Sequence, residues 1–283
     1  MEFNKMVGLK LIAPPQFWIR DYTVMANPIL EKVGNPLDQI MKVEQKVAII
    51  NIRGLMTKGA MWYDEANTAL ITEAVQTAAT SKRVQAILLN LDTPGGSVDG
   101  LDRLADAVYG ARQVKPVAAQ VDGMAASAGY YVASQANKIF TGRGDMLGSI
   151  GTLMVIDDYS EMFKNEGVKT HLIATGDYKG AGTPGVPVTE KQLKDFQRIV
   201  DAYYGQFLDA IKRGRSMDDK KLKDLADGRL FVGQEAVDNG LADGVQGIGE
   251  TFIQLAAQAQ IAHDGAMALQ DQDAARLRLA SAS

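Results

Sequence analysis

Short runs of apolar residues alternate along this chain with segments that favour helices. Mainly apolar runs with little alternation are typical of strands covered on both faces, and they predict strands at residues 47–52, 86–91 and 117–121. Further strands are predicted at 138–141 and 168–174. Helices are predicted between the first of these runs, at about residues 64–80, at 101–108, and from within 123–128 to about residue 134. Alternating strands and helices indicate βαβ units, so the predicted fold class is α/β with a largely parallel sheet.

The ends of the chain depart from this pattern. Residues 1–44 are punctuated by prolines and predict an irregular N-terminal arm, with a flexible leader as the alternative. Residues 45–248 form the predicted core, in which Thr189-Glu190-Lys191-Gln192 fits a capping box at the start of a long helix. Residues 249–283 are expected to form a C-terminal helix and a tail that frays from about Asp264.

Composition and charge exclude several classes of protein. The 283 residues have a formal net charge of −4, which argues against nucleic acid as the main partner. The absence of cysteine excludes disulfides, thiol catalysis and Cys-ligated metals, and two histidines are too few for a multi-histidine metal site. We find no signal peptide and no apolar run long enough for a membrane anchor, so the chain is expected to be soluble and cytoplasmic.

Two strand-to-helix turns are candidates for chemistry. Asp92-Thr93-Pro94-Gly95-Gly96-Ser97 leaves backbone N–H groups uncovered, which suits a developing oxyanion, although a tight turn without a ligand explains it equally well. The second turn places Ser127 among small residues at a helix start, where it is either a nucleophile or an ordinary helix N-cap.

A serine nucleophile also needs a base. His171 lies within the predicted strand at 168–174 and His263 near the frayed tail, so both are poor candidates. Lys179 lies in a glycine-rich loop, and a buried lysine can act as a base because burial disfavours its ammonium form. Adjacent carboxylates such as Asp157-Asp158 and Asp218-Asp219 make poor acid–base pairs and are expected at the surface.

Taken together and in this order, the motifs resemble peptidase family S49, which includes signal peptide peptidase A and phage capsid assembly (head-maturation) proteases. The resemblance rests on the glycine turn at 92–96, Ser127, Gly148-Ser149-Ile150-Gly151 in a glycine-rich loop at 142–151, and Lys179. It covers about residues 47–247 and includes a G-x-E-A-x-x-x-G-L-x-D segment at 233–243. One departure is Ser127-Ala128-Gly129, where many members have Ser-Gly-Gly; alanine keeps its N–H group.

This resemblance implies a ClpP/crotonase-like superfold and a Ser–Lys dyad without metal or cofactor. Ser127 is then the nucleophile, Lys179 the general base, and Ser149 a serine that orients the lysine amine. The N–H groups of Gly96, with Gly95 as an alternative, and of Ala128 would bind the oxyanion. A homo-oligomer is implied, in which the dyad can be shared between neighbouring subunits.

The implied substrate is an extended or unfolded protein segment. Because no membrane anchor is found, our first expectation is a phage or prophage head-maturation protease that acts on scaffold or capsid protein, in the host cytoplasm or the immature head. The alternatives are a soluble cytoplasmic protease like signal peptide peptidase A, a crotonase-like acyl-CoA enzyme, and an inactive scaffold that retains the fold.

Overall fold

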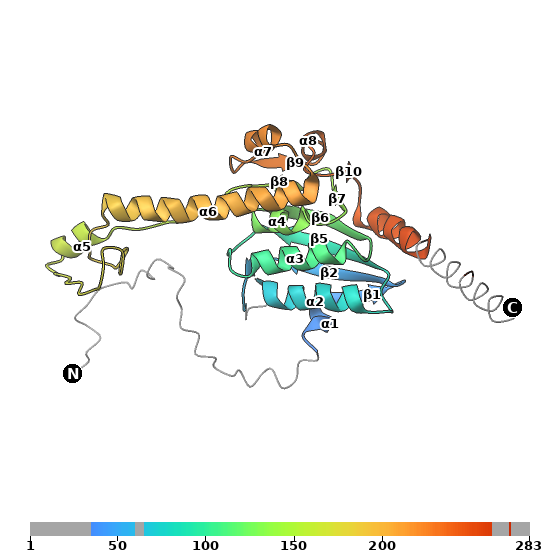
Figure 1. Ribbon diagram of the computed structural model, residues 1–283, viewed down its shortest axis with the longest axis horizontal. Coiled ribbons are helices and arrows are strands. Elements are labelled where there is room, and N and C mark those ends of the chain that lie inside the picture. The colour runs from blue at the N-terminus through green and yellow to red at the C-terminus, as the bar shows by residue number, and fades with distance from the viewer. Residues whose placement is uncertain (1–34, 60–64, 262–271, 273–283) are drawn as a thin grey trace, which may run out of the picture. The chain divides into compact units, whose positions relative to one another are not determined.

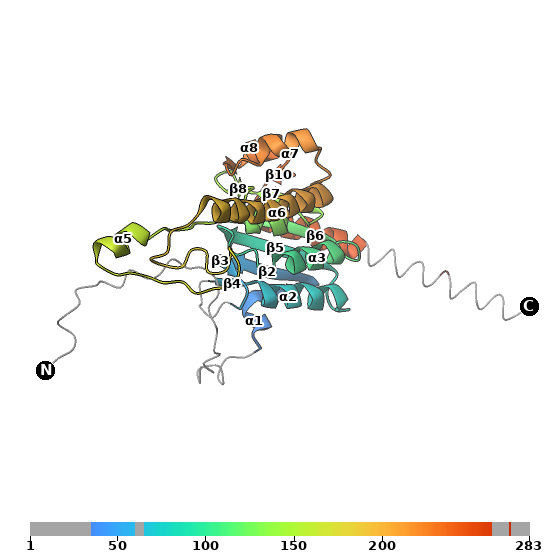
Figure 2. The same cartoon turned by 60° about the vertical axis from the view of Figure 1, so that its left-hand side comes forward.

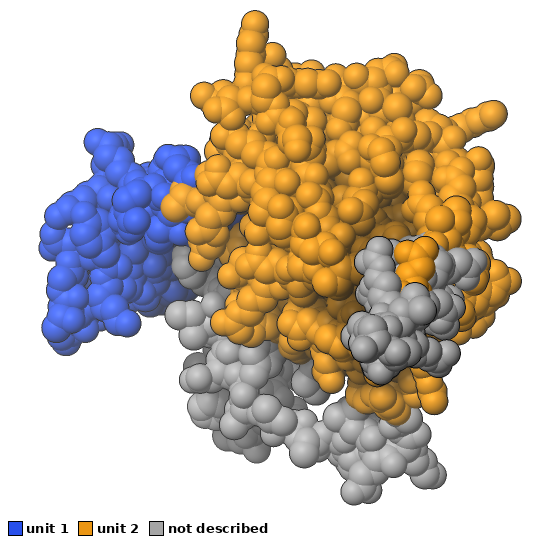
Figure 3. Space-filling view, turned by 45° about the vertical axis from the view of Figure 1, so that its right-hand side comes forward, with its two compact units in different colours: residues 1–32, 153–201 blue, residues 33–152, 202–283 orange. Residues whose placement is uncertain are grey.

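The computed structural model describes residues 35–59, 65–261 and 272. Its contacts divide the chain into two compact units, coloured separately in Figure 3. The first comprises Met1–Lys32 and Leu153–Asp201, of which only the latter is described. The second comprises Val33–Thr152 and Ala202–Ser283 and contains the sheet.

Figure 1 labels the elements of both units. The strands are β1 (Met41–Glu44), β2 (Val47–Arg53), β3 (Leu55–Thr57), β4 (Glu65–Asn67), β5 (Ala86–Thr93), β6 (Val117–Ala126), β7 (Lys138–Thr141), β8 (Met146–Gly148), β9 (Leu230–Val232) and β10 (Gly244–Val245). The helices are α1 (Leu37–Ile40), α2 (Thr68–Thr80), α3 (Leu101–Ala111), α4 (Ala128–Ala133), α5 (Ser160–Asn165), α6 (Glu190–Arg215), α7 (Asp219–Leu225) and α8 (Gln234–Asp238). Residues 248–261 are also helical.

Among the described residues, eight strands of the second unit form one sheet. Its path is β1-β2-β5-β6-β7-β10, and every pair along it is parallel except the edge pair β1–β2. The long strand β6 pairs with β7 through its first half and with β8 through its second half. β6 ends at Ala126, so the residues that follow it lie at the carboxyl end of a central strand. Ligands commonly bind at such ends in α/β proteins. The predicted α/β class with a largely parallel sheet is confirmed.

Both faces of this sheet are covered by apolar side chains. One face packs under α2 and α3, which lie along it in Figures 1 and 2, and under α4, labelled in Figure 1. This core includes the buried Ile71, Leu104 and Tyr130. The opposite face packs against the helix at 248–261 through Leu255 and Ala259. Double coverage explains why β5 is almost entirely buried and has no alternating pattern.

Four local predictions need correction. Residues 41–44, expected within the irregular arm, form β1; a Gln45-Lys46 turn with two positive φ angles joins this mostly exposed edge strand to β2. The loop expected at 142–151 contains β8, because short strands next to glycine leave little hydrophobic pattern. The third correction concerns the helix expected at about residues 64–80, which starts only at Thr68 because Glu65–Asn67 form β4. The helix expected to start within 123–128 does start there, at Ala128, directly after β6 and Ser127.

The fourth correction concerns residues 168–174, where no strand forms within the described part of the first unit. Val168, Leu172 and Ile173 are exposed, so the apolar run lacks the burial that stabilises a strand. Within the predicted N-terminal arm, Leu37–Ile40 form the short helix α1. Residues 1–34 of the arm and, apart from residue 272, the predicted tail from Asp264 lie outside the described residues. The predicted boundaries between the arm and the core, at 44/45, and between the core and the C-terminal segment, at 248/249, remain a proposal.

Candidate active site

Ser127 lies in the turn between β6 and α4, and its backbone is strained. Its φ of 50° and ψ of −118° are unusual for a residue with a side chain. Its N–H donates to the Gly148 carbonyl at 2.8 Å, and its hydroxyl makes no capping hydrogen bond to the helix. The ordinary N-cap function therefore does not explain this serine.

The chain uses the same turn a second time, with glycine. Gly233, between β9 and α8, has φ 45° and ψ −111°. Glycine adopts these angles without a steric penalty, whereas a side chain costs about 1–3 kcal/mol. A serine where glycine would suffice indicates that the side chain has a function, since strained residues concentrate at functional sites.

The Gly95-Gly96 turn packs directly against Ser127. A Cβ added to Gly95 would lie 2.7 Å from the Ser127 Cβ and 2.8 Å from the Ala128 nitrogen, and one added to Gly96 would overlap the Met56 main chain. Only glycine fits at these two positions. The sequence pattern G-G therefore reflects a close approach of this turn to the Ser127–Ala128 peptide.

Hydrogen bonding distinguishes the two glycines. The Gly95 N–H donates to the Thr93 hydroxyl at 3.0 Å, and the Gly95 carbonyl accepts from the Met56 N–H at 2.8 Å. Within the described residues, neither the N–H of Gly96 nor that of Ala128, the first residue of α4, has an acceptor. These two N–H groups are available to a ligand beside Ser127.

A pocket of about 350 Å³ opens at this point of the second unit. Ser127, Ala128 and Gly96 line it together with the first turn of α3. Tyr131 and Phe207, whose ring centroids are 5.1 Å apart, supply its aromatic wall. The pocket is large enough to hold an amino-acid side chain beside Ser127.

Ser149 is connected to Ser127 through its neighbour Gly148. It follows β8, has a φ of 51°, and donates its N–H to the Arg229 carbonyl at 2.8 Å. The preceding residue, Gly148, accepts the N–H of Ser127. The second unit thus brings together Ser127, Ser149, Ala128 and the two glycines.

Lys179 belongs to the first unit, in the loop before α6, where its side chain is exposed. His171 is exposed in the same unit, and His263 lies outside the described residues. The Asp158 carboxylate accepts from the N–H groups of Ser160 and Val188, and Asp218 caps α7, so these acidic residues have structural functions.

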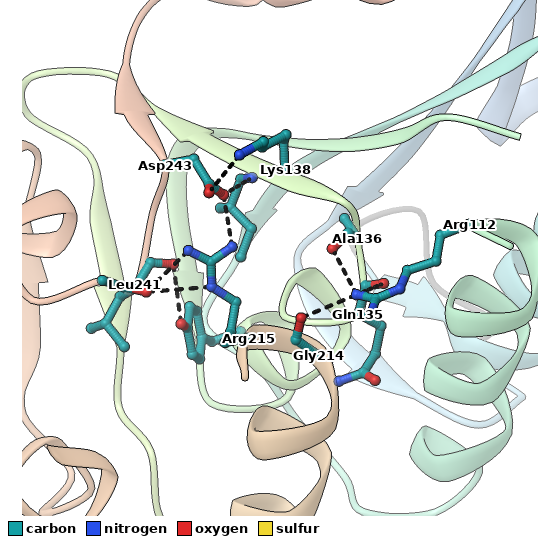
Figure 4. Close-up of polar contacts among 11 residues, drawn as sticks. Arg112, Gln135, Ala136, Lys138, Gly214, Arg215, Leu241 and Asp243 are labelled. Carbon is teal, nitrogen blue, oxygen red and sulfur yellow. Dashed lines mark hydrogen bonds and ion pairs between the residues drawn. The ribbon is translucent and has the colours of Figure 1, made fainter. Parts of the chain in front are cut away.

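The segment at 233–243 is also structural. Arg215 donates to the Gly240 carbonyl and, as Figure 4 shows, to Asp243, at 2.7 Å. The side chains of Arg215 and Asp243 are only 10 % and 19 % exposed. Burial alone would raise the pKa of Asp243; hydrogen bonds from Arg215 and the Ile139 N–H, with the charges of Arg215 and Lys138, outweigh it and lower the pKa. Arg112, directly after α3, donates to the carbonyls of Gln135 and Ala136 in the turn after α4 and to that of Gly214 in α6.

Sequence reasoning missed Thr93 as a separate part of the site. Its hydroxyl donates to the Gly54 carbonyl at 2.6 Å while accepting from Gly95, and its side chain is buried. Thr93 is part of the motif at residues 92–97, but a threonine at the end of a strand is common, so the sequence alone does not single it out.

No helix within the described ranges is long and apolar enough to span a membrane.

The chain is 27 % identical over 210 residues to protease 4 of Haemophilus influenzae, covering 74 % of this chain and 34 % of that protein. It is 33 % identical over 173 residues to capsid assembly protease C of Escherichia phage lambda, covering 61 % and 39 %. The chain therefore spans less than half the length of both relatives.

Among solved structures, an enoyl-CoA hydratase/isomerase family member superposes with a TM-score of 0.44 at 16 % identity, over 78 % of this chain and 73 % of that one. The model of peptidase family S49 matches residues 110–262, more than half of the chain and a range that includes Ser127, Ser149 and Lys179. The chain belongs to peptidase family S49.

Proposed function

We propose that this chain is a serine endopeptidase in which Ser127 attacks the scissile carbonyl and Lys179 is the general base. The observation that supports this most is the strained Ser127, which lines a pocket beside two N–H groups that have no acceptor among the described residues. Such an arrangement places a nucleophile and oxyanion donors on the same carbonyl group. Family membership supports the same chemistry.

The proposed reaction has two steps. In the first, the neutral Lys179 amine takes the hydroxyl proton of Ser127, a bond forms between the serine oxygen and the carbonyl carbon, and the Gly96 and Ala128 N–H groups bind the oxyanion. The peptide C–N bond then breaks and the amine leaves with the proton from Lys179. In the second step, water attacks the acyl-enzyme with the same lysine as base, which regenerates Ser127.

Ser149 is proposed to orient the lysine amine by accepting a hydrogen bond from it. Its strained backbone, next to the residue that accepts the Ser127 N–H, supports a position near the nucleophile. Gly95 is assigned a supporting function instead of oxyanion binding, because its N–H already donates to Thr93.

We further propose that the active form is a homo-oligomer in which the first unit packs against a second copy of the chain. None of the described residues 153–201 is buried, and Leu153, Val155 and Ile173 are strongly exposed. A compact unit without buried apolar side chains of its own needs another surface to cover it.

The proposed substrate is an extended or unfolded protein segment, and our first assignment is scaffold or capsid protein of a phage head. Similarity to capsid assembly protease C supports this assignment. It would place the reaction in the host cytoplasm or the immature head. The alternative is a cellular protease like signal peptide peptidase A, which would use the same catalytic groups.

Digestion of a denatured protein by the purified chain tests the proposal. The wild type is expected to produce fragments, identified by mass spectrometry, that the Ser127→Ala variant does not produce. Equal cleavage by both proteins would contradict the assignment of Ser127 and point to a contaminating protease.

A further inference from the structure

Thr93, the last residue of β5, connects the glycine turn to its surroundings through three contacts. Its hydroxyl donates to the Gly54 carbonyl at 2.6 Å and accepts the Gly95 N–H at 3.0 Å. Its methyl group lies under α4, since a Cβ added to Gly129 would be 2.6 Å from Thr93 Cγ2. The side chain is completely buried.

The direction of these hydrogen bonds is determined by the chemistry of the hydroxyl. A hydroxyl has one proton to donate, and a carbonyl oxygen can only accept it, so the Gly54 bond uses the proton. A lone pair is then turned toward the Gly95 N–H. A water molecule could not easily replace this acceptor, because the position is buried.

The main-chain hydrogen bonds of the glycine turn show what the contact between Thr93 and Gly95 does. Met56 in β3 donates its N–H to the Gly95 carbonyl and accepts the Ser97 N–H, both at 2.8 Å. The Gly95 N–H donates its hydrogen bond to the Thr93 hydroxyl. Of the N–H groups of Gly95, Gly96 and Ser97, only that of Gly96 then has no acceptor within the described residues.

We propose that Thr93 is a positioning residue for the oxyanion site. Its hydroxyl holds the N–H of the Pro94–Gly95 peptide, and the Met56 N–H holds the carbonyl of the next peptide, Gly95–Gly96, so that the Gly96 N–H, and no other in the turn, points to the carbonyl attacked by Ser127. This inference rests on the proposed function. It assigns to Thr93 a specific hydroxyl requirement, which an apolar side chain of equal size does not satisfy. It also explains why Gly129 has no side chain, since the Thr93 methyl group occupies that space.

The first test compares Thr93→Val, which keeps the shape, with Thr93→Ser, which keeps the hydroxyl. Removing an oxyanion donor lowers kcat by about 10²–10³-fold, so a misdirected donor is expected to lower kcat by at least roughly 10-fold in Thr93→Val. KM should change little, because the ground-state carbonyl depends less on the donor. Affinity for a peptide boronic acid, which forms a tetrahedral adduct, should fall with kcat, and Thr93→Ser should restore both.

The second test uses the methyl group and does not depend on Thr93→Val being folded. Gly129→Ala is expected to push Thr93 and lower kcat in the wild-type background. In the Thr93→Ser background the methyl group is absent, so the same Gly129→Ala change should have a much smaller effect. Equal losses in both backgrounds would contradict the inference.

Different results would overturn the proposed function and the assignment of Thr93. If the wild type and Ser127→Ala cleave protein equally, the proposed function is wrong. If only the wild type cleaves, but Thr93→Val retains its kcat and its boronic acid affinity, the proposed function stands and the assignment of Thr93 is overturned.

Discussion

The backbone conformation of Ser127 makes a prediction that can be measured without any substrate. Replacing Ser127 by glycine should stabilise the protein relative to replacing it by alanine. Both variants lack the hydroxyl, and the serine makes no capping hydrogen bond whose loss would complicate the comparison. The two variants therefore differ only in the Cβ atom of alanine, which makes the backbone angles of φ 50° and ψ −118° strained.

The magnitude follows from two opposing contributions. Strain of this kind costs about 1–3 kcal/mol, and glycine relieves it. Glycine also increases the entropy of the unfolded chain, which costs about 0.5–1 kcal/mol. The expected net gain for Ser127→Gly over Ser127→Ala is about 1 kcal/mol, which corresponds to roughly 2–4 °C in Tm for a protein of about this size.

Urea denaturation followed by circular dichroism, at one protein concentration, measures this difference. Ser81 offers a matched control, because it has an ordinary backbone with φ −69° and ψ 126°. There the order should reverse, with the glycine variant less stable than the alanine variant by about 0.5–1 kcal/mol. If glycine destabilises position 127 as it does position 81, the Ser127 backbone is not strained and the argument from strain to function is wrong.

Three further perturbations test other parts of the account. Gly96→Ala should lower kcat by at least about 10²-fold, measured with a peptide substrate, because its Cβ would overlap the main chain of β3 and move the proposed donor. Asp243→Asn should lower the free energy of unfolding by on the order of 3 kcal/mol at neutral pH, because it breaks a mostly buried ion pair with Arg215. The lowered pKa of Asp243 stabilises the folded state above about pH 4, so this difference should shrink in urea titrations as pH falls through the folded-state pKa. Mixing inactive Ser127→Ala with inactive Lys179→Ala should restore some cleavage if the dyad is shared between subunits, whereas mixed oligomers that stay inactive would contradict sharing.

The sheet could be predicted well from the sequence because its central strands are covered on both faces. The runs at 86–91 and 117–121 are apolar except for Asn90 and Gln120, and both form parallel strands at those positions. The capping box at Thr189 was equally readable, since its Gln192 side chain accepts from the Thr189 N–H at 3.0 Å.

Elements without a burial pattern could not be predicted in the same way. β1 is an edge strand with mostly exposed side chains, so its sequence resembles a loop. The opposite error occurred at 168–174, where apolar residues suggested a strand but Ile173 is 97 % exposed. Hydrophobicity reports the preference for burial and does not specify which surface provides it.

The candidate site was found through its motifs, but its geometry was not. Motif order indicated Ser127, Ser149 and the glycine turn, and the structure assembles them in one unit. The difference between Gly95 and Gly96 depends on one hydroxyl, that of Thr93, whose hydrogen bonds no sequence pattern specifies. Backbone strain at Ser127 is likewise a property of the fold, since the same angles occur at Gly233.

The central claim, that Ser127 is the nucleophile, is tested most directly by covalent trapping. The purified protein is incubated with a peptidyl diphenyl phosphonate, which reacts with activated serines, and the adduct is located by mass spectrometry of proteolytic fragments. The account predicts one adduct per chain on Ser127 in the wild type, and no adduct on Ser127→Gly. An adduct on another residue, or cleavage of protein by a chain that is never labelled at Ser127, would contradict it.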